Sequence, residues 1–208
     1  MGSTDSSDGQ PFVRPARLID AADFAAVQHR SWSAAAEALE LPAPPDAAHI
    51  ERAWERAITV PPTQRHRSLI AVDRFADGEV VRGVAAVAPA SDPDLDPSDC
   101  VELVVLAVDP QWRGRGHGSR LMAAAMQAAA DSGEREAVTW VASGDDATRR
   151  FLEASGWVAD GAFRTLTEGD SEPDQDGEVR ELRQVRLATS LESCDSAADE
   201  GASTTGAG

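Results

Sequence analysis

The hydrophobic positions of the chain fall into short strand-like runs and into longer stretches with helical spacing. Residues 12–18 alternate apolar with basic or small side chains, as a half-buried strand does. Trp54 and Ile58 stand four residues apart and therefore point to one side of a helix. This pattern predicts strands over residues 12–18, 68–74, 79–88, 100–108, 136–142, 157–166 and 179–187, and helices over 21–30, 46–58, 121–130 and 145–155.

Turn and cap residues mark the ends of these elements. Asp20 is a plausible N-cap for the first helix, and the proline-rich run 41–45 separates that helix from the second. Asp77-Gly78 predicts the turn of a β-hairpin, and Gly156 suits the C′ position after the fourth helix. The predicted order is therefore β-α-α-β-β-β-α-β-α-β-β.

A single domain is predicted over residues 11–189, because the chain is long enough for one core and contains no obvious internal linker. Residues 1–10 and 190–208 are rich in Gly, Ser, Asp and Ala, so we expect both to be disordered tails. Acidic runs at 92–99 and 168–178 are expected to be solvated loops.

The composition argues against several classes of protein. A net charge of −17 leaves no basic surface for a nucleic acid. No apolar run approaches the ~20 residues that span a bilayer, so no membrane partner is expected. The first residues lack the pattern of a signal peptide, which favours a cytoplasmic protein. Neither the two cysteines nor the four scattered histidines predict a metal site, and Cys100 is expected to be a small buried hydrophobe.

The segment 109–121 carries the most informative chemistry of the chain. It joins the apolar run 101–108 to an Ala-, Leu- and Met-rich helix through three glycines at alternate positions. The first amides of a helix lack partners within the helix, the helix dipole adds positive charge there, and glycines let an anion approach. The sequence therefore predicts a pyrophosphate cradle formed by Arg113, Gly114, Arg115, Gly116, His117, Gly118 and Ser119. An ordinary glycine-rich turn between strand and helix is the alternative.

The spacing of the glycines narrows the choice of ligand. A P-loop requires a lysine, and this chain has none, while Ser119 stands where the third glycine of a dinucleotide-binding fingerprint would follow. The pattern that fits is Arg-x-x-Gly-x-Gly, read as Arg113, Gly116 and Gly118 after a strand that ends Val-Asp-Pro. Here the chain resembles the GNAT superfamily of acetyl-CoA-dependent N-acyltransferases.

A second motif supports this resemblance. Residues 145–157 are similar to the family's helix Asn-x-x-Ala-x-x-Phe-Tyr-x-x-x-Gly-Phe, and the order of elements agrees over about residues 12–188. The resemblance implies a mixed α/β, mostly antiparallel GNAT-like fold with acetyl-CoA as cofactor. It also implies that the pantetheine arm lies along Leu106, Ala107 and Val108, where this strand diverges from 136–142, and that Asp145 contributes to the same site.

For the catalytic base, Glu102 is the first candidate, because it starts the cofactor-carrying strand at the end where an amine would approach. The alternative is that Glu102 caps a strand edge or pairs with an arginine. His117 could titrate near neutrality, but its place in the glycine turn makes it a neighbour of the phosphate, with its ring N–H groups outward.

Leu152 departs from the family pattern, because it stands where the family has a tyrosine proposed to protonate the leaving thiolate. The implied activity is acetyl transfer to a primary amine of a small molecule or peptide, by direct attack in a ternary complex. A non-catalytic module that binds acyl-CoA is the alternative. Residues 30–67, with Trp32 and the Trp54 helix, are expected to wall the acceptor pocket, and the alternative is that these indoles belong to the core. The protein is expected to be a monomer or homodimer.

Overall fold

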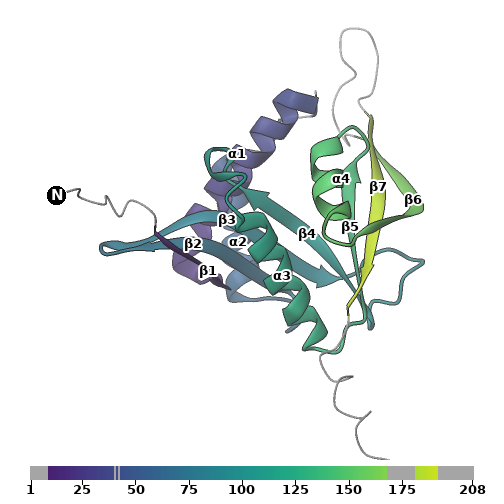
Figure 1. The fold of residues 1–208 in the computed structure, drawn as a ribbon, viewed down its shortest axis with the longest axis horizontal. Helices are drawn as coiled ribbons and strands as arrows, with labels where there is room; N and C mark the ends of the chain where they lie inside the picture. Colours follow the sequence, from purple (N-terminus) through teal and green to yellow (C-terminus); the bar gives the residue numbers. More distant parts are fainter. Residues whose placement is uncertain (1–8, 40, 42, 168–180, 192–208) are drawn as a thin grey trace, which may run out of the picture.

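A computed structural model describes residues 9–39, 41, 43–167 and 181–191, and Figure 1 shows their arrangement. The strands are β1 (Gln10–Pro15), β2 (Arg67–Phe75), β3 (Gly78–Pro89), β4 (Cys100–Val108), β5 (Glu136–Ala142), β6 (Val158–Thr167) and β7 (Glu181–Ser190). The helices are α1 (Ala21–Leu39), α2 (Ala47–Thr59), α3 (His117–Ala130) and α4 (Asp146–Glu153), with short 3-10 turns η1 (Leu18–Asp20) and η2 (Pro110–Trp112). The predicted element order and fold class are confirmed.

All seven strands form one sheet in the order β1-β2-β3-β4-β5-β7-β6, in which only β4 and β5 run parallel. Helices α3 and α4 cover one face of this sheet, and α1 and α2 cover the β2–β4 part of the other (Figure 1). The acidic run 168–178 and most of the two expected tails lie outside the described residues, although β1 already includes Gln10 and β7 extends to Ser190.

Apolar side chains of alternate strand positions form a core on each face of the sheet. On the α3 side, Leu121 and Ala125 pack with Val101 and Leu103 of β4. On the α1 side, a second core contains Phe24, together with residues of β2 and β3. Because β2, β3 and β4 each contribute to both cores, this part of the sheet is fixed between its two helical layers.

The first strand and helix differ from the prediction. Pairing with β2 ends at Pro15, and the chain then turns through η1, so the predicted strand 12–18 stops early. Asp20 lies in η1, where its carboxylate accepts hydrogen bonds from the Arg17 amide and the Arg14 guanidinium. Helix α1 continues nine residues past the predicted end at Arg30 because residues 31–39 are mostly good helix formers, chiefly alanine.

The parallel pairing of β4 and β5 is short. It covers three residue pairs, the last of which is Glu102 with Val138. Directly beyond it, the Thr139 hydroxyl donates a hydrogen bond of 2.9 Å to the carbonyl of Leu103. A bulge opposite β3 also leaves Val104 without a paired residue. Beyond this point the two strands separate, and the β4 edge that faces β5 loses its strand partner, as the resemblance implied.

We expect stability to fall in acid because of a carboxylate cluster around Arg14. Its guanidinium contacts Asp20 at 2.7 Å and Glu79 at 3.0 Å. Burial alone would raise the pKa of Asp20, but hydrogen bonds from Arg14 and the Arg17 amide outweigh it and lower that pKa. Hydrogen bonds from Arg74 and Arg14 lower the pKa of Glu79.

Both carboxyls therefore bind protons less readily in the folded state than in the unfolded state. Their stabilising effect is complete above the unfolded pKa of about 4 and disappears as the pH falls through the lower folded pKa. Urea unfolding should give a free energy that declines below about pH 4, with a smaller decline in Arg14→Met. An unchanged free energy down to about pH 3 would contradict this expectation.

Candidate cofactor-binding cleft

A cleft of about 1030 Å³ opens where β4 and β5 separate. It is lined by the second half of α1, by β4 from Leu103 to Val108, by the glycine turn, by the end of β5 and by the first turn of α4. Of the residues predicted to bind the cofactor, all but Arg115 line this cleft. The structure thus brings together the strand, the turn and the Asp145 motif, which are distant in the sequence.

The glycine turn is built by local backbone requirements. The Asp109 carboxylate accepts a hydrogen bond from the Gln111 amide and another from Arg30 of α1 at 2.7 Å, which anchors the start of the turn. Gly114 and Gly116 have φ angles of 74° and 81°, a left-handed conformation that favours glycine. Helix α3 then begins at His117.

Because α3 begins here, the amides of His117, Gly118 and Ser119 have no acceptor four residues earlier within the helix. All three residues line the cleft. Together with the positive end of the helix dipole, they can bind a diphosphate. Arg113, which donates a hydrogen bond to Ser31 of α1 at 3.1 Å, adds a full positive charge to the same wall.

Arg115 points elsewhere. Its guanidinium carbon lies 4.4 Å from the centre of the Trp112 ring, and Arg82 lies 3.4 Å from the same ring. The Arg115 backbone carbonyl accepts a hydrogen bond from Arg120. These contacts make Arg115 part of the support of the turn.

The ring of His117 faces the protein interior. It is only 3% exposed, and its Nε2 atom lies 3.9 Å from a carboxylate oxygen of Asp73 on β2. Burial lowers the pKa of His117 below its ordinary value, against the opposing effect of Asp73. The prediction that the ring N–H groups point outward is therefore wrong, and the residue offers the cleft its backbone amide.

Glu102 lies outside the set of residues that line the cleft. It is partly exposed and accepts a hydrogen bond of 3.3 Å from the Ser91 hydroxyl. It belongs to the last β4–β5 pair, which places it near the point where the strands separate. A role as the catalytic base stays a prediction.

Helix α4 forms the wall next to the glycine turn. The Asp145 carboxylate accepts hydrogen bonds from the amide and the hydroxyl of Thr148, so it caps this helix. Phe151 and Leu152 follow on the cleft side, and Leu152 is only 2% exposed. At the position of the family's tyrosine, this chain therefore has a buried apolar side chain.

Trp140 of β5 lines the cleft but was not predicted from the sequence. Of the two tryptophans predicted to form the acceptor wall, only one lies there. Trp32 lines the cleft as expected. Trp54 instead packs on Phe24, with ring centres 4.1 Å apart, and donates a hydrogen bond to Gln28. An aromatic residue at the end of a diverging strand was the available signal for Trp140.

The acidic run 92–99 is more than a solvated loop. Asp92 and Asp94 bind the buried guanidinium of Arg186 at 3.2 and 2.9 Å, and Asp160 of β6 binds it at 2.7 Å. This corrects the expectation for that run. The ion pairs of Asp92 and Asp94 with Arg186 hold the loop against β7.

Cys100 is predicted to be unreactive. It is 2% exposed, and burial, with a smaller effect of Glu136, raises the pKa of its thiol to about 11. In Cys194→Ser, which leaves Cys100 as the single thiol, Ellman's reagent at neutral pH should label no cysteine in the folded protein and one after unfolding in urea. Rapid labelling of the folded variant would contradict the burial of this thiol.

Comparisons with known proteins identify the class that this fold and cleft define. The sequence profile described as the acetyltransferase (GNAT) family matches residues 29–157. The chain belongs to this family, so it is an acyltransferase of a class that uses acetyl-CoA. A comparison with curated protein sequences gives no significant match.

Solved structures share the fold at low sequence identity. An N-acetyltransferase from Staphylococcus aureus Mu50 aligns with 16% identity and a TM-score of 0.63, covering 88% of this chain and 99% of its own. The putative acetyltransferase yncA from Salmonella typhimurium, solved with acetyl-CoA, aligns with 17% identity and a TM-score of 0.60, covering 92% and 99%. A ribosomal-protein-alanine N-acetyltransferase from Brucella melitensis aligns with 19% identity and a TM-score of 0.60, covering 86% of this chain and 99% of its own. In the described part of the chain, no helix has the length and hydrophobicity needed to cross a membrane.

Proposed function

We propose that the protein transfers the acetyl group of acetyl-CoA to a primary amine of a small molecule or peptide, by direct attack within a ternary complex. One observation carries this proposal. A single cleft joins the amide-rich turn at the start of α3 to the space between α1 and the end of β5. Donor and acceptor can therefore occupy it together, which a direct transfer requires.

The residues fit the donor in two places. The amides at the start of α3 and Arg113 would hold the diphosphate. The free edge of β4 at Leu106–Val108 would bind the pantetheine arm through backbone groups, as a short added strand. When bound, acetyl-CoA supplies an activated thioester carbonyl.

Transfer forms a bond between the acceptor nitrogen and the acetyl carbon and breaks the carbon–sulfur bond. The nitrogen gives up a proton, and the coenzyme leaves as a thiolate. We propose that the Glu102 carboxylate accepts this proton through a water molecule, because Glu102 does not line the cleft. Leu152 offers the thiolate no proton, so we expect the coenzyme to leave unassisted at this position.

The experiment is a screen of purified protein and acetyl-CoA against primary amines, following thiol release and the mass of the acetylated product. Time-dependent formation of an N-acetyl product supports the proposal, and a lower kcat in Glu102→Gln supports the role of that carboxylate. Saturable acetyl-CoA binding without turnover across the screen would contradict it and favour the non-catalytic module. Unchanged kinetics in Glu102→Gln would remove only the assignment of the base.

A further inference from the structure

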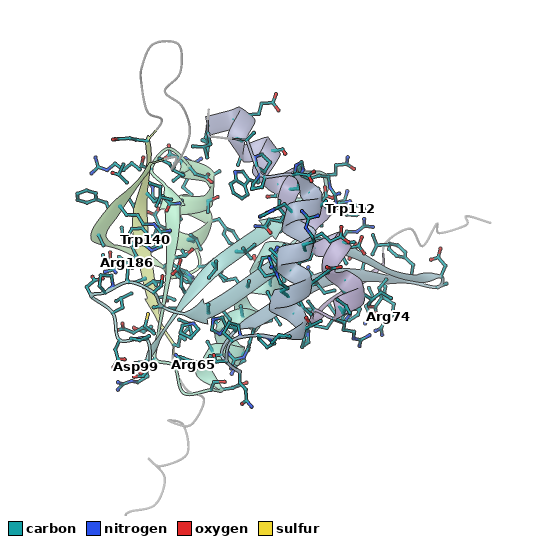
Figure 2. All side chains as sticks on the ribbon, turned by 180° about the vertical axis from the view of Figure 1, so that it is seen from behind. Arg65, Arg74, Asp99, Trp112, Trp140 and Arg186 are labelled. Atoms are coloured by element: carbon teal, nitrogen blue, oxygen red, sulfur yellow. The ribbon has the colours of Figure 1, made fainter. Side chains whose placement is uncertain are left out.

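Trp140 forms the β5 wall of the cleft on the face of the sheet that α1 and α2 only partly cover. It stands opposite Arg186 of β7 in the strand register. Figure 2 shows Trp140 and Arg186 close together on the β5–β7 part of the back face, beside the region covered by α1. The indole therefore borders the cleft from the β5 side.

The guanidinium groups of two arginines lie against this indole. The guanidinium carbon of Arg164 lies 4.3 Å from the ring centre, and that of Arg186 lies 5.7 Å away. Arg164 is itself fixed by a hydrogen bond of 2.7 Å to Gln184. Cations that already sit against the ring compete with a positively charged substrate for the same electron-rich surface.

Three carboxylates on the β6–β7 side of this wall are already paired with a cation. Asp92, Asp94 and Asp160 all contact Arg186. Among the described residues that line the cleft, the acidic ones are Asp145 and Asp146, both at the start of α4. Apart from Glu102, which belongs to the last β4–β5 pair and is assigned the acceptor's proton, the wall at Trp140 therefore offers a polycationic acceptor few unpaired carboxylates.

The facing wall is apolar as well. The second half of α1 contributes Trp32, Ala35, Ala38 and Leu39, and the bulged residue Val104 of β4 lies between the two walls. Trp32 is 39% exposed and Val104 is 52% exposed, so both offer hydrocarbon surface that a ligand could cover. Flat aromatic bodies bury large apolar areas against indoles.

Building on the proposed acetyl transfer, we propose that the acceptor is a primary amine on an apolar, aryl-bearing body and that Trp140 determines this specificity. Trp140 and Trp32 bind the aryl group from β5 and α1. Arg164 and Arg186 act as positioning residues that orient Trp140.

The test compares phenethylamine, an aryl-bearing amine, with putrescine, a cationic diamine of similar length. Wild-type kcat/KM should favour phenethylamine by at least about tenfold. Trp140→Ala should raise KM for phenethylamine about tenfold with little change for putrescine, and Trp140→Phe should restore most of the affinity. Phe163→Ala is the matched control, because Phe163 is an exposed aromatic residue of β6 that does not line the cleft.

The outcomes separate this proposal from the proposed function. A wild-type preference for putrescine, or a Trp140→Ala variant with unchanged KM for phenethylamine, overturns the assigned specificity while acetyl transfer stands. If no amine is acetylated although acetyl-CoA binds, both proposals fail together. Acetyl-CoA affinity is measured in each variant, and an unchanged value shows that Trp140→Ala retains its folded donor site.

Discussion

Replacing Gly116 with tryptophan should abolish the stabilisation that acetyl-CoA gives to the wild-type protein. Gly116 has a φ angle of 81°, which disfavours any residue with a Cβ atom. A Cβ atom at this position would also lie 3.0 Å from the guanidinium of Arg120. An indole there would fill the space before the α3 amides, so the diphosphate would lose its site.

The measurement is thermal unfolding with and without acetyl-CoA. At about a hundred times the Kd, a ligand stabilises the folded state by about 2.7 kcal/mol. For a domain of this size, this stabilisation raises the Tm by roughly 5–10 °C. Gly116→Trp should show no such rise.

Gly133→Trp is the matched control. Gly133 has a φ angle of 92°, a Cβ atom there would meet no neighbour within 4 Å, and the residue does not line the cleft. The Gly133→Trp variant should have a lower Tm without ligand and should keep the full rise in Tm on adding acetyl-CoA. If Gly116→Trp also kept this response, the assigned position of the donor site would be wrong.

Replacing Arg186 with methionine should produce the largest loss of stability among the surface-loop contacts. The Arg186 side chain is only 7% exposed and is shared by three aspartates from the 92–99 loop and β6. Removing it leaves Asp92, Asp94 and Asp160 close together without their cation. Because these carboxylates retain some access to water, we expect a loss of about 2–3 kcal/mol rather than the full cost for a buried pair.

Urea unfolding measures this loss, and Arg135→Met provides the control. Arg135 also binds an aspartate of the same loop, Asp99, but its side chain is 75% exposed. Its loss should cost much less, because exposed ion pairs contribute little to stability. Equal effects of the two substitutions would show that burial does not set the strength of the Arg186 contacts.

The donor side of the cleft could be predicted from the sequence because its determinants are local. The ends of β4 and β5 agree with prediction to the residue, since each is a mainly apolar run flanked by polar residues. The glycines at 114 and 116 likewise specify a backbone that few other residues adopt. The turn and the helix behind it follow from this short stretch.

Features that depend on distant partners could not be predicted in the same way. The orientation of the His117 ring is set by its burial near Asp73 on another strand. Asp92 and Asp94 of the loop contact Arg186 of β7, which lies more than ninety residues away in the sequence. Trp32 and Trp140 line the same cleft because the fold places α1 and β5 around it, a relation that no local pattern encodes.

Calorimetric titration of acetyl-CoA into the wild-type protein tests the central claim most directly, since every assigned role depends on a cleft that binds this thioester. The predicted result is saturable binding of one molecule per chain. If titration at several temperatures gave no heat of binding, and acetyl-CoA did not raise the Tm of the wild-type protein, the assignment would be contradicted.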